Sequence, residues 1–297
     1  MIKVIAADLD GTLLGTNHVL NRTTYEAILR AQRAGIRFVV ATGRDYIGAI
    51  RTFNGFDLGC DWIVASGAEI RNSKGEVLQS IPMRPENFPI ILDRLKGLDV
   101  HTRFCVTGKD YVIGDEEEVM KNLMEEAKLW LNLKEGENIK ENKEFKVAQQ
   151  RVRCIGSLEE LLAENLAIYK VFVSSANLEQ IALVNERLAD LTDIASASSF
   201  VTNVELTDVK AQKGPIIKQY IEERGYRMDE VMVLGDSLND YSMISMDFGA
   251  TIAMENGMEE IKKAAKYVTK SNAENGVAYT IDRLLAVQGR QVKNGNY

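Results

Sequence analysis

Short apolar runs alternate with amphipathic stretches through the first part of the chain. Residues 2–7, 37–41 and 62–66 have the length and β-branched content of buried strands. Between the first two, residues 23–34 carry apolar side chains at helical spacing, and Gly35 follows as a helix stop. The pattern predicts strands and helices that follow one another in turn.

The same alternation returns in the last third of the chain. A helix is expected from Lys213, followed by strands at 231–235 and 249–254 and by further helices. Strands that alternate with helices form parallel sheets with helices on both faces. The two ends of the chain therefore predict one α/β domain with a doubly wound, mostly parallel sheet.

The middle of the chain has another character, which begins at Pro82. Charge is dense from residue 115 to residue 146, where a helix is expected in the first half and a solvated loop over residues 134–146. This region predicts a separate α+β domain inserted into the first one. The expected domains are a core of residues 1–82 and 198–297 and an insertion of residues 83–197.

Composition limits the classes of protein to consider. The 297 residues carry a formal net charge of -7, which does not favour general nucleic-acid binding. No apolar run approaches the ~18 residues of a membrane span, so neither a membrane segment nor a signal peptide is expected. Three scattered cysteines suit a reducing, cytoplasmic compartment. Nothing in the sequence indicates an oligomeric state.

Two aspartates, Asp8 and Asp10, stand directly after the first expected strand. Side chains at i and i+2 of an extended segment point the same way. Two carboxylates at one point repel each other, so the arrangement needs a cation or chemistry that uses both. An EF-hand calcium loop is excluded, because Leu13 and Val19 occupy the positions that require Gly and Glu. An ordinary acidic turn after a strand is the simpler alternative.

Further polar side chains lie at other expected strand ends and helix starts. Thr42 follows the second strand, Lys213 opens a helix, and a later strand leads into Asp236, Asn239 and Asp240. The carboxyl ends of parallel strands share one edge of a sheet, which is where open α/β sheets bind ligands. Taken singly, Thr42 is explained by a helix cap and Lys213 by a surface position. Together, the acids, hydroxyl, amide and ammonium indicate a divalent cation beside a phosphate.

These segments resemble the four motifs of the haloacid dehalogenase superfamily, in the same order. DLDGT, ATGR, Lys213-Gly214 and GDSLND match the motifs. The resemblance is to the Cof-type branch of phosphatases, which carries a large inserted cap, and it covers nearly the whole chain. It implies a Rossmann-like core with the inserted domain as its cap. The chain departs from the branch at Ser66-Gly67-Ala68, where NGA is common, and at Asn275, where an aspartate is common.

The resemblance implies a role for each motif residue. Asp8 matches the nucleophile that forms an aspartyl-phosphate. Asp10 matches the general acid that protonates the leaving alcohol and the base that then activates water, which requires Asp10 to hold a proton while Asp8 stays ionised. Thr42 and Lys213 match groups that hold the transferring phosphoryl oxygens, and Asn239 is expected to bind phosphate.

Gly43 and Arg44, in the ATGR segment, are expected to reach phosphate or substrate, with a surface ion pair as the alternative for Arg44. The resemblance also implies Mg²⁺ as the cofactor. Asp10 is expected to contribute its backbone carbonyl, and Asp240 to support the metal shell or Lys213. The expected metal site comprises Asp8, Asp10, Asp236 and Asp240.

The resemblance implies a cytoplasmic, Mg²⁺-dependent phosphatase that hydrolyses small phosphorylated metabolites, with no nucleic-acid or membrane partner. Sugar phosphates, nucleotides and phosphorylated cofactors all fit this expectation. A phosphotransferase or phosphomutase, in which a second hydroxyl replaces water, is the nearest alternative. A metabolite-sensing regulator with an inactive phosphatase fold is another, although such a protein would be expected to lack one of the chemical groups.

Overall fold

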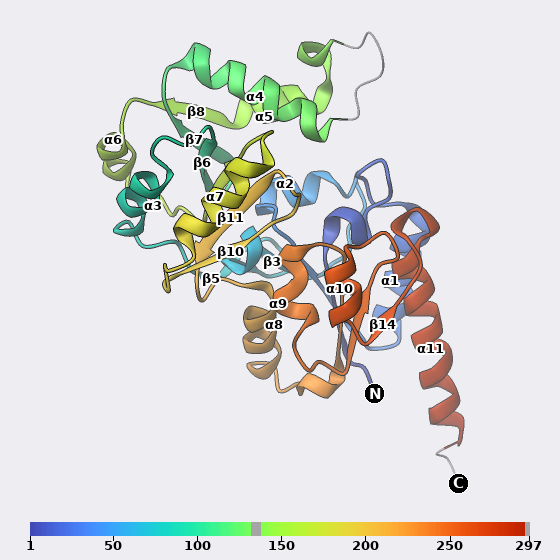
Figure 1. Ribbon diagram of the computed structural model, residues 1–297. Coiled ribbons are helices and arrows are strands. Elements are labelled where there is room, and N and C mark those ends of the chain that lie inside the picture. Colours follow the sequence, from blue (N-terminus) through green and yellow to red (C-terminus); the bar gives the residue numbers. More distant parts are fainter. Residues whose placement is uncertain (132–137, 295–297) are drawn as a thin grey trace. The chain divides into compact units, whose positions relative to one another are not determined.

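The computed structural model describes residues 1–131 and 138–294 and divides into two compact units. Unit 1 comprises residues 1–80 and 210–297, and unit 2 comprises residues 81–209 (Figure 1). The second boundary therefore lies at residue 209 and not at the expected residue 197. The physical reason is strand pairing, because residues 203–208 form a strand that is hydrogen-bonded on both sides within unit 2.

Unit 1 is built on an eight-stranded sheet in the order β14-β13-β12-β1-β2-β3-β4-β5. The strands from β14 to β3 are parallel, and β4 and β5 extend the sheet as antiparallel strands at one edge. This confirms the doubly wound, mostly parallel sheet that the alternating pattern predicted. The strands are β1 (Val4–Ala7), β2 (Arg37–Ala41), β3 (Asp61–Val64), β4 (Glu69–Arg71), β5 (Val77–Ser80), β12 (Val231–Gly235), β13 (Ala250–Ala253) and β14 (Tyr267–Val268).

Helices cover both faces of this sheet. On one face α1 and α11 pack together against buried side chains such as Ile5, Phe38 and Leu234, and Figure 1 shows α11 lying alongside α1. On the other face α8 contacts β3, and α9 contacts α8, β12 and β13. The helices are α1 (Arg22–Arg33), α2 (Tyr46–Arg51), α8 (Lys213–Glu222), α9 (Tyr241–Ile244), α10 (Glu259–Ala264) and α11 (Gly276–Asn294).

Unit 2 has its own six-stranded sheet in the order β10-β11-β9-β6-β7-β8. Its pairs are antiparallel except for β7 and β8, which are parallel. The strands are β6 (His101–Val106), β7 (Lys109–Ile113), β8 (Val152–Ile155), β9 (Lys170–Ser174), β10 (Ile194–Ala197) and β11 (Asn203–Asp208), and the helices are α3 (Asn87–Leu95), α4 (Glu116–Trp130), α5 (Lys143–Arg151), α6 (Leu158–Ala163) and α7 (Leu178–Leu188).

Two apolar clusters hold unit 2 together. The larger one lies between the sheet and helices α3 and α7, and it contains Phe104 and Val171. The smaller one joins α4 to α5 through Leu123 and Phe145. The loop expected over residues 134–146 lies partly outside the described residues, and its last part is wrong because α5 begins at Lys143, where the Asn142 side chain caps the helix.

No helix within residues 1–131 and 138–294 combines the length and the apolar character that crossing a bilayer would require.

Gly214 lies where α8 packs against α9. A Cβ at this position would collide with the backbone carbonyl of Ser242 and approach the Met246 sulfur to 2.7 Å. Gly214→Ala is therefore expected to lower the free energy of unfolding by about 1–3 kcal/mol, because the crowding atom is backbone and cannot rotate away. Gly289→Ala is the control, since nothing lies within 4 Å of its added Cβ. Chemical denaturation that gives both variants the same stability would contradict this account.

Candidate active site

Asp8 leaves the end of β1 at the centre of the sheet. Its backbone N–H donates to the Leu234 carbonyl at 3.0 Å, so the neighbouring strand β12 fixes its position. The next residues, Leu9–Leu13, coil back so that the Leu13 N–H reaches the Asp8 carbonyl at 3.2 Å. Gly11 permits this turn with φ +77, and any side chain there would run into the Asp236 carboxylate. The two acidic loops are thus held against each other.

A buried lysine joins the two loops. The Lys213 ammonium donates to Asp8 Oδ1 at 2.7 Å and to Asp240 Oδ1 at 2.6 Å, and it lies 3.5 Å from Asn239 Oδ1. The Lys213 side chain is 0% exposed. Four residues that the sequence predicted would converge therefore do so around one ammonium group.

Asp240 uses its second carboxylate oxygen to close its own loop. Oδ2 accepts from the backbone N–H of Asp236 at 2.9 Å and of Ser237 at 3.1 Å. Both oxygens of this buried carboxylate are thus occupied, one by Lys213 and one by backbone. Of the two roles expected for Asp240, its geometry favours the support of Lys213 over direct ligation of a metal.

Asp236 faces Asp8 across the loop junction. The Thr12 hydroxyl donates to Asp236 Oδ1 at 2.7 Å. Ligand oxygens of Asp8, Asp236 and Asp240 all lie within 4.8 Å of one another. Such an oxygen-only donor set fits a hard divalent cation such as Mg²⁺, with Asp8 and Asp236 as its side-chain ligands.

Burial and mutual repulsion act on these carboxylates. Burial raises the pKa of Asp236 to about 7, the Asp240 charge adds to the effect, and Thr12 and Lys213 oppose it. Burial also raises the pKa of Asp8 well above its ordinary value, with the Asp240 charge acting in the same direction and the Lys213 charge against it. Both carboxylates are therefore harder to ionise than usual. A bound cation would lower their pKa values, because it would offset their negative charge.

Asp10 points to a different partner. The Arg44 guanidinium binds it with two hydrogen bonds, Nε to Oδ2 at 2.6 Å and Nη2 to Oδ1 at 2.7 Å, and His18 Nδ1 lies 3.8 Å from Oδ1. Burial acts to raise the pKa of Asp10, but the hydrogen bonds and charges of Arg44 and His18 outweigh it and lower the pKa below its ordinary value.

This direction is the opposite of the expected one. The role of Asp10 as an acid required it to hold a proton while Asp8 stayed ionised, whereas here the pKa of Asp10 is lowered and that of Asp8 is raised. The reasons are the Arg44 pair, which stabilises the Asp10 carboxylate, and the burial of Asp8 beside the charge of Asp240, which together outweigh Lys213. Arg44 thus pairs with an acid of the site, and both side chains of this pair are partly exposed.

Thr42 and Gly43 follow the end of β2, the neighbour of β1 in the sheet. Thr42 is buried, and its hydroxyl oxygen accepts the backbone N–H of Arg44 at 3.1 Å, which fixes the turn that delivers the guanidinium. The structure thus places Thr42 at the expected sheet edge. Gly43 lies in the same turn, between Thr42 and Arg44.

Three contributors to the site were not singled out for a role by sequence reasoning. Thr12 orients Asp236, and His18 approaches Asp10. Asn256 donates to the Gly11 carbonyl at 2.8 Å and so holds the aspartate loop from outside. Thr12 could have been found from its place in the DLDGT segment, but Asn256 lies too far along the chain for any spacing to connect it.

The raised pKa of Asp236 gives a signed prediction for metal binding. Protonated carboxyls do not bind metal, so Mg²⁺ should bind about tenfold more tightly at pH 8 than at pH 6. The pKa of Asp236 is near 3.8 in the unfolded chain and is raised to about 7 in the folded protein. The contribution of Asp236 to the stability of the metal-free protein therefore falls as the pH rises through this range. The rise in melting temperature caused by a fixed Mg²⁺ concentration should therefore be larger at pH 8. Equal rises at both pH values, or an unchanged difference in Asp236→Asn, would contradict this.

Comparison with known proteins agrees with this geometry. Residues 5–281 match the family model of haloacid dehalogenase-like hydrolases. The 5-amino-6-(5-phospho-D-ribitylamino)uracil phosphatase YwtE of Bacillus subtilis is 30% identical over 97% of this chain and 99% of its own, and the phosphatase YwpJ of the same organism is 29% identical over 96% and 100%.

Solved structures show the same fold. A haloacid dehalogenase-like hydrolase from B. subtilis superposes with a TM-score of 0.80 at 27% identity, covering 96% of this chain and 100% of that one. The family match extends from the first strand of unit 1 to its last helix, and so includes all of the motif residues. The chain belongs to the haloacid dehalogenase-like hydrolase family.

Proposed function

We propose that this protein is a Mg²⁺-dependent phosphatase of small phosphorylated metabolites that works through an aspartyl-phosphate on Asp8. The observation that carries the proposal is the contact of Asp8 with a fully buried ammonium, Lys213, at 2.7 Å beside a second carboxylate, Asp236. A carboxylate that attacks a phosphate dianion meets charge repulsion. The cluster supplies a fixed positive charge and an oxygen site for a cation, and both oppose that repulsion.

The chain's own residues would divide the reaction between them. Asp8 attacks phosphorus and forms the acyl phosphate as the ester oxygen leaves. Asp10 gives its proton to that oxygen, and then removes a proton from the water that hydrolyses the intermediate. Lys213 holds Asp8 in place and faces the negative charge of the phosphoryl group, with Thr42 and Asn239 as neutral partners for its oxygens. Mg²⁺, when bound by Asp8 and Asp236, would neutralise charge on the transferring group.

Arg44 has to change partners in this scheme. While it binds both oxygens of Asp10, that carboxylate stays ionised and cannot act as an acid. A phosphate dianion is a stronger partner for a guanidinium than one carboxylate. We therefore expect a bound substrate to draw Arg44 away, which would raise the pKa of Asp10 toward the range of an acid catalyst.

The relatives narrow the substrate only to a class. YwtE is named for a phosphorylated ribitylamino-uracil, and a relative in Escherichia coli, 24% identical, is named a pyridoxal phosphate phosphatase. Both are phosphate monoesters of small molecules. We propose the same class here and expect the protein to act in the cytoplasm, where its three free thiols would stay reduced.

The test is a panel of phosphorylated metabolites assayed for free phosphate, with Mg²⁺ and with a chelator in its place. Phosphate release that depends on Mg²⁺ supports the proposal. A hexose phosphate whose phosphate migrates to another hydroxyl would support a mutase instead. Binding without release of phosphate from any compound would support the metabolite-sensing regulator.

A further inference from the structure

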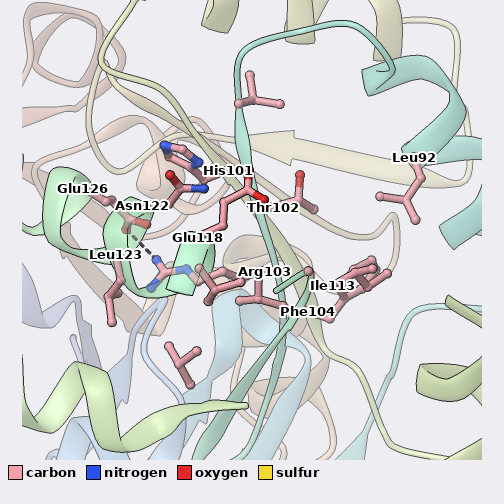
Figure 2. Close-up of a pocket in the computed structure, with 15 residues that line it drawn as sticks. Leu92, His101, Thr102, Arg103, Phe104, Ile113, Glu118, Asn122, Leu123 and Glu126 are labelled. Carbon is pink, nitrogen blue, oxygen red and sulfur yellow. Dashed lines mark hydrogen bonds and ion pairs between the residues drawn. The ribbon is translucent and has the colours of Figure 1, made fainter. Parts of the chain in front are cut away.

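Unit 2 contains a cavity of about 320 Å³ that belongs to this unit alone. It lies between the first half of β6, the end of β7 and the first turns of α4, and Figure 2 shows the side chains that line it. Its volume falls at the lower end of the range of small-molecule sites. None of its lining residues belongs to the motifs of the candidate active site.

The cavity exists because two neighbouring strands separate. The β6–β7 ladder begins next to the turn, where Val106 pairs with Lys109, and it ends at the pair of Phe104 and Tyr111. On their other edges both strands stay paired past that point, β6 with β9 from Cys105 back to His101 and β7 with β8 from Asp110 to Ile113. The facing edges of Thr102–Arg103 and Val112–Ile113 are left apart, and α4 covers the gap.

The two sides of the cavity differ in chemistry. Leu92 and Ile113 form an apolar side, and His101, Asn122 and Glu126 lie together opposite them (Figure 2). An apolar surface facing convergent polar groups is the usual composition of a site for a small organic molecule.

Arg103 is the most specific feature of the polar side. Its Nη2 donates to Glu126 Oε1 at 2.8 Å, and its guanidinium lies 4.5 Å from the centre of the Phe172 ring. Its Nε is buried and has no hydrogen-bond partner within the described part of the chain. A buried donor without a partner is destabilising. A ligand that placed an acceptor beside Arg103 Nε would satisfy this donor and so gain binding energy.

The charges of the lining select the kind of ligand. Glu118 and Glu126 bring two carboxylates against the single guanidinium of Arg103. The formal balance of these three side chains is negative, which disfavours phosphates and carboxylates. The ligand must still offer an acceptor to the Arg103 Nε–H, and a donor N–H would suit the carboxylate of Glu118.

We propose that this cavity binds an uncharged nitrogen heterocycle that carries a carbonyl and an N–H on one edge. The carbonyl accepts from Arg103 Nε, the N–H donates to Glu118, and the ring lies against Leu92 and Ile113. The lining suits an unphosphorylated molecule, and none of the residues that would hold the ligand belongs to the motifs of the candidate active site.

The test is calorimetric titration of the full-length protein with uracil, which has such an edge, and with orotate, the same ring with a carboxylate added. Uracil should bind with a Kd below about 1 mM, and orotate at least about tenfold more weakly. Arg103→Lys removes the Nε donor but keeps a cation for Glu126, and Glu118→Ala removes the acceptor from an exposed helix position. Each should weaken uracil binding about tenfold, the loss of one hydrogen bond to a charged group.

Glu117→Ala is the matched control, because Glu117 precedes Glu118 on α4 and does not line the cavity. It should bind uracil like the wild type. Absence of uracil binding, equal binding in Arg103→Lys and the wild type, or equal affinity for orotate would overturn the proposal. Phosphate release measured on the same samples reports on the proposed function separately, since neither Arg103 nor Glu118 belongs to the motifs of the candidate active site.

Discussion

Asp8→Asn is expected to lower phosphatase turnover by on the order of 10⁴-fold or more, because an amide cannot attack phosphorus and form the acyl phosphate. The substitution keeps the size of the side chain and removes only its charge and nucleophilic oxygen. The measurement is kcat with the best substrate of the metabolite panel, together with a search for a phosphorylated protein after rapid acid quench. The label should be present in the wild type and absent from Asp8→Asn.

A measurement of thermal stability shows whether Asp8→Asn lost activity because it lost the nucleophile or because it unfolded. Asp8 is buried beside Asp236 and Asp240, and its pKa is raised, so removal of its charge relieves repulsion in the metal-free protein. Asp8→Asn should therefore unfold at a temperature no lower than the wild type does. Asp247→Asn, with a side chain that is 95% exposed, is the control and should keep full activity. Wild-type turnover in Asp8→Asn would remove the basis of the proposed mechanism.

The core sheet was predictable because its strands are buried on both faces. All four residues of β1 are buried, and so are all five of β12, which makes each a continuous apolar run. A continuous run is the strongest strand signal that a single sequence carries. The carboxyl ends of these strands then fixed where Asp8 and Asp236 had to lie, before any distance was known.

The strands of unit 2 were harder to predict. β8 reads VRCI and β11 reads NVELTD, so polar side chains interrupt both. In β11 every residue is buried, including Asn203, Glu205 and Asp208. Buried charges of this kind depend on partners elsewhere, such as Lys170, which lies 3.1 Å from Glu205. A sequence does not show those partners, and for this reason the inserted domain was expected to end too early.

The sequence indicated which residues form the site, but not all of the hydrogen bonds between their side chains. Their places at the ends of expected strands and at a helix start indicated that Asp8, Lys213 and Asp240 would meet. The sequence could not show that Arg44 would take both oxygens of Asp10, because an arginine can reach many partners from one backbone position. The pKa values of the two aspartates depend on that pairing, and their directions, lowered for Asp10 and raised for Asp8, are the opposite of those expected.

Lys213→Met is expected to lower kcat/KM by about 10²–10³-fold and to destabilise the protein by about 3–5 kcal/mol. The Lys213 side chain is 0% exposed, and burial acts to lower its pKa, but the charges of Asp240 and Asp8 outweigh burial and raise it, so the ammonium stays charged. Methionine fills nearly the same volume without the charge. It leaves two buried carboxylates facing each other, and it removes the cation that faces the phosphoryl group. Steady-state kinetics and chemical denaturation measure the two effects.

A second substitution separates these effects. Lys213→Met/Asp240→Asn removes one of the two carboxylates that lost their partner, so it should recover part of the stability but none of the activity. Lys218→Met, on the same helix with a side chain 49% exposed, is the matched control and should change neither quantity by much. If the double variant regained activity along with stability, Lys213 would serve only to hold the fold. If stability returned without turnover, the ammonium would act on the reacting phosphate, as the proposed mechanism requires.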